Sequence, residues 1–102
     1  MPKVDVDIGV PGIREIYVEF EGDDEEVKAS LFVLGHKIGD RRIGIDPARQ
    51  DGYSYYSEEE NAPGNVQLKL EVWVHWATRV LTLVVLYKSP LGKGKKENRT
   101  TW

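Results

Sequence analysis

The sequence predicts an all-β fold: an antiparallel β-sandwich of about seven strands, or a partly open barrel. Residues 66–76 alternate between apolar and polar side chains, the period-2 pattern of a strand with one face on a core. Residues 79–88 follow closely and are apolar on both faces at their centre, as in a strand that is covered on both sides. Short segments rich in Gly, Pro, Asn and Asp separate the strand-like runs, a spacing typical of sandwiches and small barrels.

Three further strands are expected in the first half of the chain. Valine and isoleucine alternate with aspartate and glycine over residues 4–10, and Pro11-Gly12 then favours a turn. Apolar residues alternate with acidic ones and a tyrosine over residues 14–21, which indicates a second strand with one polar face. Residues 41–45 are short and β-branched at alternate positions, so they are expected to form a third strand.

Residues 24–34 permit two interpretations. As a strand over 26–34, alternate residues from Val27 to Val33 share one apolar face. As a helix, an aspartate would cap the first turn and Gly35 would end the last one, which would make the fold α+β. We favour the strand because the neighbouring segments are strands and the period-2 pattern fits better.

The remaining segments are polar. Residues 46–65 form a long polar connection that contains a tyrosine cluster and one short strand, 53–57, before strong turn chemistry. Residues 89–102 are rich in lysine, glycine and proline, so they are expected to form a flexible basic C-terminal tail. The prediction is therefore a single β-rich domain at residues 1–88 followed by this tail.

Composition restricts the classes of function. The chain has 102 residues, enough for one domain with its own core, and no cysteine, which excludes disulfides and thiolate metal sites. The net charge is −3, but residues 88–102 carry +4 and residues 1–87 carry −7. An acidic body makes nucleic acid an unlikely partner for it. No apolar run is long enough to span a membrane, and no leader-like segment is evident, so we expect a cytoplasmic protein, with secretion left open.

We expect a protein that is not an enzyme, because the sequence lacks the common catalytic motifs. The two histidines, His36 and His75, lie in a turn-like and a strand-like context, and no serine occupies a nucleophile elbow. No phosphate-binding glycine loop or zinc-binding helix motif is present. Paired acids such as Asp5, Asp7 and Glu19 leave a small carboxylate-dependent hydrolase as a third hypothesis, provided that one of them sits in an apolar pocket.

A binding surface is the first hypothesis. Tyrosine and serine are interleaved around Tyr53, Tyr55 and Tyr56, the composition of surfaces that recognise other molecules. Trp73 and His75 lie on the otherwise polar face of the strand at 66–76, where a large aromatic residue can anchor an interface. We expect a non-enzymatic module that uses these five residues to bind a protein partner or a second copy of itself as a homodimer. In the alternative interpretation, Tyr53 and Tyr55 face the core while Tyr56 lies on the surface.

Ligand binding is the second hypothesis. The exposed tyrosines are also suited to stacking on the rings of a carbohydrate. Oxygen ligands for Ca²⁺ are available in two acidic loops, although no EF-hand pattern is present. The candidate metal ligands are Asp23, Asp24, Asp46 and Asp51. Apart from this calcium ion, the sequence suggests no cofactor.

Overall fold

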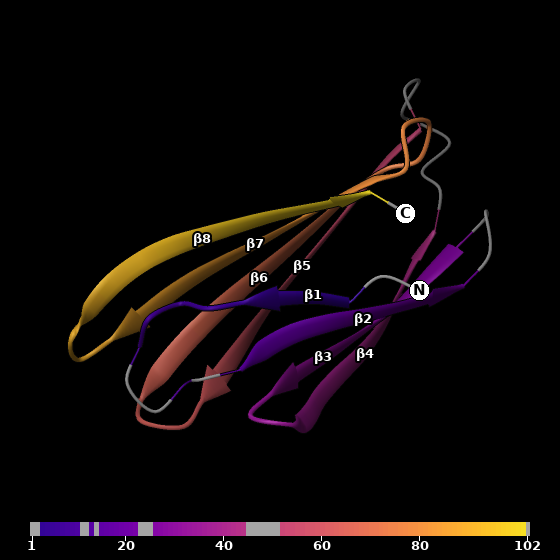
Figure 1. Ribbon diagram of the computed structural model, residues 1–102. Helices are drawn as coiled ribbons and strands as arrows, with labels where there is room; N and C mark the ends of the chain where they lie inside the picture. The colour runs from indigo at the N-terminus through magenta and orange to yellow at the C-terminus, as the bar shows by residue number, and fades with distance from the viewer. Residues whose placement is uncertain (1–2, 11–12, 14, 23–25, 45–51, 102) are drawn as a thin grey trace.

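The computed structural model is all-β and consists of two four-stranded antiparallel sheets packed face to face (Figure 1). It describes residues 3–10, 13, 15–22, 26–44 and 52–101. The N-terminal sheet contains β1 (Lys3–Val6), β2 (Ile16–Gly22), β3 (Glu26–Val33) and β4 (His36–Gly44). The C-terminal sheet contains β5 (Tyr53–Ala62), β6 (Val66–His75), β7 (Val80–Ser89) and β8 (Gly92–Thr101). The β-sandwich prediction is confirmed.

Each sheet is a simple meander, in which every strand pairs with the next one along the chain. Tight turns set the registers. Leu34 and Gly35 connect β3 to β4 with φ of 53° and 76°, so both central residues of this two-residue turn are left-handed. That backbone shape matches the twist of a hairpin, but it costs energy at Leu34 because of its Cβ.

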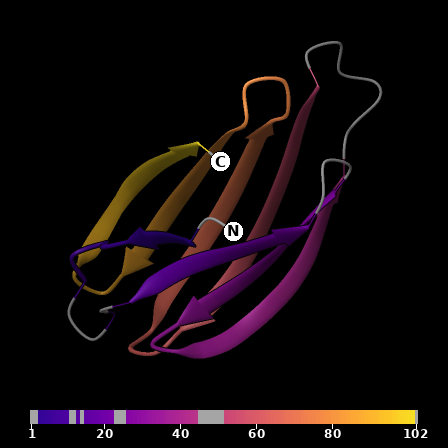
Figure 2. The same cartoon turned by 45° about the vertical axis from the view of Figure 1, so that its right-hand side comes forward.

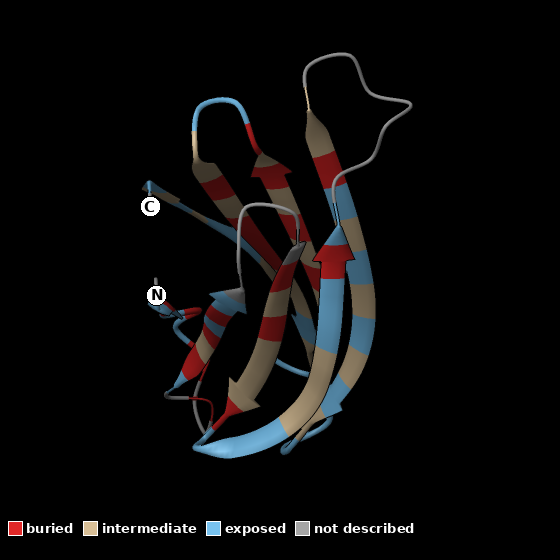
Figure 3. Cartoon of the chain, turned by 90° about the vertical axis from the view of Figure 1, so that its right-hand side faces the viewer, coloured by how far each residue is buried: buried red, intermediate tan, exposed pale blue. Residues whose placement is uncertain are grey.

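The core lies between the two sheets (Figure 2). Alternate residues of each strand point inward, and Figure 3 shows the resulting buried bands along the strands. The largest side chains that are almost completely buried come from both sheets and from the segment after β1: Ile8, Ile16, Val18, Phe20, Leu68, Val74, Leu81, Leu83 and Val85. For the strands with a clear period-2 pattern, β2 and β6 among them, the alternation therefore also predicted which side faces the core.

Side-chain hydrogen bonds join the sheets at both sides of the sandwich. On one side, the Ser54 hydroxyl of β5 donates to the Gly44 carbonyl of β4. On the other side, the Asn98 amide of β8 donates to the Asp5 carbonyl of β1 over 2.7 Å. Because the strand ladders themselves stop at these edges among the described residues, the fold is two sheets and not the partly open barrel.

Three expectations need correction. The helix at 24–34 is wrong, because residues 26–33 pair as β3 with both β2 and β4. Strand β4 begins at His36, well before residue 41, so His36 opens a strand. The short strand at 53–57 is the first half of β5, which continues to Ala62 through residues expected to be a polar connection.

The prediction of a flexible tail at 89–102 is also wrong, since residues 92–101 form β8 and pair with the whole of β7. The physical reason is that β7 offers a ten-residue backbone to a segment whose own composition is unfavourable for strands. Tyr87 of β7 also lies so close over Gly94 that a Cβ there would collide with the tyrosine ring. Cross-strand packing therefore overrides the local preference of a Gly/Lys-rich segment.

No helix is found among the described residues, and hence none that could cross a membrane.

Candidate functional site

Four of the five predicted binding residues meet on the outer face of the C-terminal sheet. The β5–β6 register sets Tyr53 opposite His75 and Tyr55 opposite Trp73. The ring centroids of Tyr55 and Trp73 are 4.1 Å apart, those of Tyr53 and Trp73 5.3 Å, and those of Tyr53 and His75 5.9 Å. We call Tyr53, Tyr55, Trp73 and His75 the aromatic face.

The polar ring atoms of Trp73 and His75 contact neighbours on β6 and in the turn that follows it. The Trp73 indole N–H points to Glu71, with 3.4 Å between Nε1 and Oε2, and the Nδ1 of His75 contacts the Thr78 hydroxyl. Tyr55 is 41% exposed, whereas the other three side chains are half-buried against one another. The rings are thus held in place by the sheet while part of their surface remains in contact with solvent.

The aromatic face continues onto β7. The β6–β7 register places Thr82 beside Trp73 and Val84 beside Glu71, and Leu86 follows on the same face. Together with Tyr53 and Trp73, these residues line an open trough of about 330 Å³. Its remaining lining residues are charged: Glu71, Lys95, Glu97 and Arg99.

Strand β7 was expected to be covered on both sides, and the structure covers it on one. Leu81, Leu83 and Val85 point into the sandwich and are completely buried. On the opposite face, Val84 is 6% exposed and does not belong to the core cluster, and the N-terminal sheet lies on the other side of the C-terminal sheet (Figures 1 and 2). No described element of the chain lies over this outer face.

Tyr56, the fifth predicted binding residue, points the opposite way, toward the space between the sheets. Its hydroxyl accepts a hydrogen bond from Arg41 Nε at 2.7 Å and donates one to Glu58, which also pairs with Arg41. Burial, and then the hydrogen bond and charge of Glu58, raise the pKa of Tyr56 to about 12. Tyr56 therefore joins β4 to β5 and takes no part in the aromatic face.

The alternative interpretation, with Tyr53 and Tyr55 inward and Tyr56 outward, is wrong because Ser54 and Tyr56 occupy the inward positions of β5. Ser54 is 3% exposed and accepts a hydrogen bond from the Trp76 indole over 2.8 Å. The β5–β6 register decides this, because Ser54 and Tyr56 lie opposite Val74 and Val72, which are buried in the core.

Sequence reasoning missed the contribution of β7 and β8 to this site. Thr82, Val84 and Leu86 belong to a strand that was expected to be buried on both faces, and Arg99 to a segment expected to be a mobile tail. The apolar residues on both faces of β7 could have indicated this contribution, because a face that the sandwich does not cover must be covered by another molecule or stay in contact with water.

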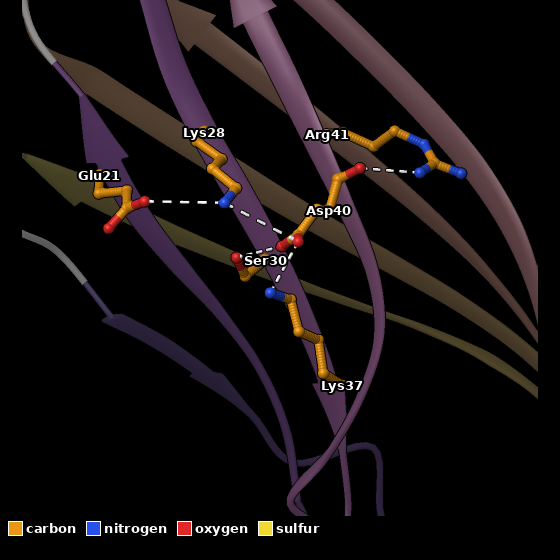
Figure 4. A network of polar contacts seen from close by, with 6 residues as sticks. All are labelled: Glu21, Lys28, Ser30, Lys37, Asp40 and Arg41. Atoms are coloured by element: carbon orange, nitrogen blue, oxygen red, sulfur yellow. Dashed lines mark hydrogen bonds and ion pairs between the residues drawn. The ribbon is translucent and has the colours of Figure 1, made fainter.

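A second polar cluster lies on the outer face of the N-terminal sheet (Figure 4). Asp40 accepts a hydrogen bond from the Ser30 hydroxyl at 2.6 Å and pairs with Lys37 at 2.7 Å. Lys28 lies 3.8 Å from both Asp40 and Glu21. The hydrogen bonds from Lys37 and Ser30 lower the pKa of Asp40. A carboxylate held ionised by several donors is suited to joining β3 and β4, and not to transferring protons.

The carboxylates of the hydrolase hypothesis lie on the surface. Asp5 and Glu19 are exposed on β1 and β2, and Asp5 lies 3.8 Å from the ammonium of Lys3. Asp7 accepts a hydrogen bond from the backbone N–H of Gly9 at 2.8 Å, as in a local turn. None of the three sits in the apolar surroundings that an acid–base pair requires, so the geometry does not favour this chemistry.

The predicted calcium ligands Asp23, Asp24, Asp46 and Asp51 all lie outside the described residues. Within the part of the chain that the structure describes, no three histidine or acidic side chains are grouped to hold a metal ion. Calcium binding therefore stays a prediction.

Comparison with protein-family models, curated proteins and solved structures finds no significant match to this chain.

Proposed function

We propose that this chain is a non-enzymatic binding module whose contact surface is the aromatic face together with the outer residues of β7, and whose ligand is the surface of another protein. One observation carries the proposal. Strand β7 has apolar residues on both faces, and the sandwich covers only the inner one. The outer face presents the partly exposed side chains of Trp73 and Leu86, and it gains free energy when a partner removes this apolar surface from water.

The side chains of the aromatic face suit this role. Tyrosine and tryptophan provide large contact areas and lose little conformational entropy on binding, because few torsions must be fixed. Here Trp73 is already packed between Tyr53 and Tyr55, so much of that entropy is lost on folding. Charged groups at the rim, Glu71 and Arg99 among them, give a partner polar contacts that define orientation.

A carbohydrate is the second candidate ligand, and the trough is the observation that favours it. Its volume of about 330 Å³ lies at the lower end of small-ligand sites, and two aromatic rings stand beside charged groups. A sugar ring can stack on Trp73 while Glu71 and Arg99 bond its hydroxyls. A protein partner remains the better fit because the apolar positions extend along β7 beyond the rings.

The test compares two aromatic pairs on opposite sides of the sandwich. Trp73→Ala removes the centre of the aromatic face, and Tyr17→Ala is its matched control, since Tyr17 stacks on Phe32 with centroids 4.7 Å apart. Proteins captured from a lysate by the immobilised wild-type chain are identified, and each is then titrated, as a purified protein, against the wild type and both variants. A glycan array probed with the same three proteins tests the second candidate.

We expect Trp73→Ala to weaken binding of the partner at least tenfold, as for an interface anchor, and Tyr17→Ala to leave it unchanged. A partner whose affinity is equal for all three proteins would contradict the proposed surface. A glycan that binds the wild type but not Trp73→Ala, in the absence of any such protein, would assign the trough to carbohydrate.

A further inference from the structure

The two edges of the C-terminal sheet carry opposite charge. Edge strand β5 contains Glu58, Glu59 and Glu60 and no basic residue. Edge strand β8 contains Lys93, Lys95, Lys96 and Arg99 against a single glutamate, Glu97. Strands β6 and β7 separate these edges, so the opposite charges do not neutralise each other within one copy.

The charges on both edges are only partly balanced by their own neighbours: on β5, Glu58 pairs with Arg41 of β4. No carboxylate of the described residues lies within ion-pair distance of Lys93, Lys95 or Lys96, although Arg99 lies 3.6 Å from Glu97. On β5, partial burial and the adjacent Glu58 raise the pKa of Glu60, as expected where carboxylates are crowded. One edge would therefore gain from added positive charge, and the other from added negative charge.

The hydrogen-bonded ladder stops at both edges. Among the described residues, β5 pairs only with β6, and β8 pairs only with β7. Strand β1 approaches β8 through the Asn98 side chain and not through a backbone ladder. An edge strand of this kind is a template for a further strand.

We infer that copies of this chain associate head to tail, with β8 of one copy beside β5 of the next, so that the C-terminal sheet continues from copy to copy. The strand directions permit this arrangement. Because β5 to β8 form an antiparallel meander, β8 runs opposite to β5, and a copy related by translation and twist presents an antiparallel β5.

The register of the sheet predicts which residues would meet. Following the cross-strand pairs, Glu59 lies in one row with Lys69, Leu86 and Lys95. If the next copy continues these rows, Lys95 faces Glu59, Lys96 faces Glu58, and Arg99 faces the ring of Tyr55. Two opposite-charge pairs and one cation–π contact result, with no like charges directly opposed.

Other arrangements are less favourable. A shift of the register by two residues in one direction sets Glu59 against Glu97, and in the other direction retains only the pair of Glu59 with Lys93. Symmetric dimers through β5 and β5, or through β8 and β8, bring like charges together. The charges thus select a heterologous contact, which produces an open-ended assembly unless the rotation closes a ring.

Sedimentation velocity and light scattering of the full chain test the inference, over a concentration series at about 20 mM and about 0.5 M NaCl, since salt screens exposed charges. Glu59→Lys and Lys95→Glu each oppose like charges at the proposed contact. Their controls make the same changes of charge elsewhere on the exposed surface: Glu15→Lys and Lys88→Glu. Each single reversal should weaken association about tenfold, and neither control should.

A mixing experiment distinguishes the head-to-tail contact from a symmetric one. Glu59→Lys alone sets two lysines against each other in the row that joins positions 59 and 95, and Lys95→Glu alone sets two glutamates there, so neither should assemble. In an equimolar mixture each contact between unlike copies pairs opposite charges in this row, and association should return to that of the wild type. A symmetric contact cannot show this complementation at both edges. If a reversal unfolds the chain, as seen by circular dichroism, Glu59→Gln and Lys95→Gln provide the same test with a smaller expected effect.

A wild type that stays monomeric at low salt throughout the series would overturn the inference. So would an assembly that both charge reversals leave intact. If such an assembly is instead lost in Trp73→Ala, the contact belongs to the aromatic face, and the proposed function gains a second copy as its partner. Conversely, loss of partner binding by the aromatic face leaves this inference untouched, because its test depends on residues 59 and 95.

Discussion

The Ser54 hydroxyl provides a sensitive test of how the two sheets are joined. This buried group accepts a hydrogen bond from the Trp76 indole and donates one to the Gly44 carbonyl, so that it connects β5 to β4 and to the residue after β6. Ser54→Ala removes both bonds with little change in volume. It also leaves the buried Trp76 N–H without this acceptor, which adds a desolvation cost.

The magnitude follows from these contacts. Each net hydrogen bond contributes about 1 kcal/mol, so we expect Ser54→Ala to lower the free energy of unfolding by about 2 kcal/mol. For a domain of this size, that corresponds to a decrease in Tm of about 10 °C. Ser57→Ala is the matched control, because Ser57 lies on the same strand with its side chain exposed, and we expect a change within about 0.5 kcal/mol.

Urea unfolding followed by tryptophan fluorescence measures both variants, and a double-mutant cycle isolates the Trp76 bond. When Trp76→Phe has already removed the indole donor, Ser54→Ala should cost about 1 kcal/mol less than it does in the wild type. Equal costs for Ser54→Ala and Ser57→Ala would refute the reasoning. Strict additivity in the cycle would show that the Trp76 bond contributes nothing and that only the Gly44 bond is important.

Three further predictions concern pH and backbone strain. The pKa of Tyr56 is raised to about 12, so Tyr56 keeps its proton in the folded chain at pH values above 10, where the unfolded chain has lost it. Its contribution to the free energy of unfolding, about 1 kcal/mol after screening by solvent, is complete below pH 10 and is lost as the pH rises to 12. Phenolate absorbance should show one late-titrating tyrosine that is missing in Tyr56→Phe, and titration of all tyrosines near pH 10 would contradict this. The lowered pKa of Asp40 acts in the opposite direction, since its contribution is present above its unfolded pKa and is lost as the pH falls; Asp40→Asn should therefore lower the Tm at pH 7 but not at pH 2, and an equal deficit at both pH values would argue against it. Leu34→Asn should raise the free energy of unfolding by about 1 kcal/mol because asparagine tolerates the left-handed turn beside Gly35; thermal melts measure it, and a lower Tm would show that the exposed leucine packs on a neighbour.

Much of the candidate site was predictable from local pattern. The alternation along β6 placed Trp73 on the polar face, and composition grouped the tyrosines of β5 with it as one binding surface. The register between β5 and β6 was not predicted. Parity along β5 also implies that Tyr56 cannot share a face with Tyr53 and Tyr55. What the pattern lacked was the sign of that parity, because both faces of β5 carry polar and aromatic residues.

The C-terminal strand shows the opposite case. Apart from Thr100 and Thr101, the local composition of residues 92–101 does not favour a strand, and the pairing with β7 supplies the hydrogen bonds that make it one. Without β8 the sheet would have no basic edge, and the trough would lack Lys95 and Arg99. These features arise from contacts between strands and not from preferences within one.

By itself, the sequence determined the all-β class, most of the strands and the side of each clear strand that faces the core, because a period-2 pattern of apolar residues has only one way to remove itself from water. The tertiary structure decided which apolar face stays uncovered, which tyrosine turns inward and where the basic edge lies. Those outcomes depend on which strands pair and which sheet lies over which. Strand pairing and sheet packing depend on contacts between residues far apart in the chain, so a local sequence pattern cannot predict them.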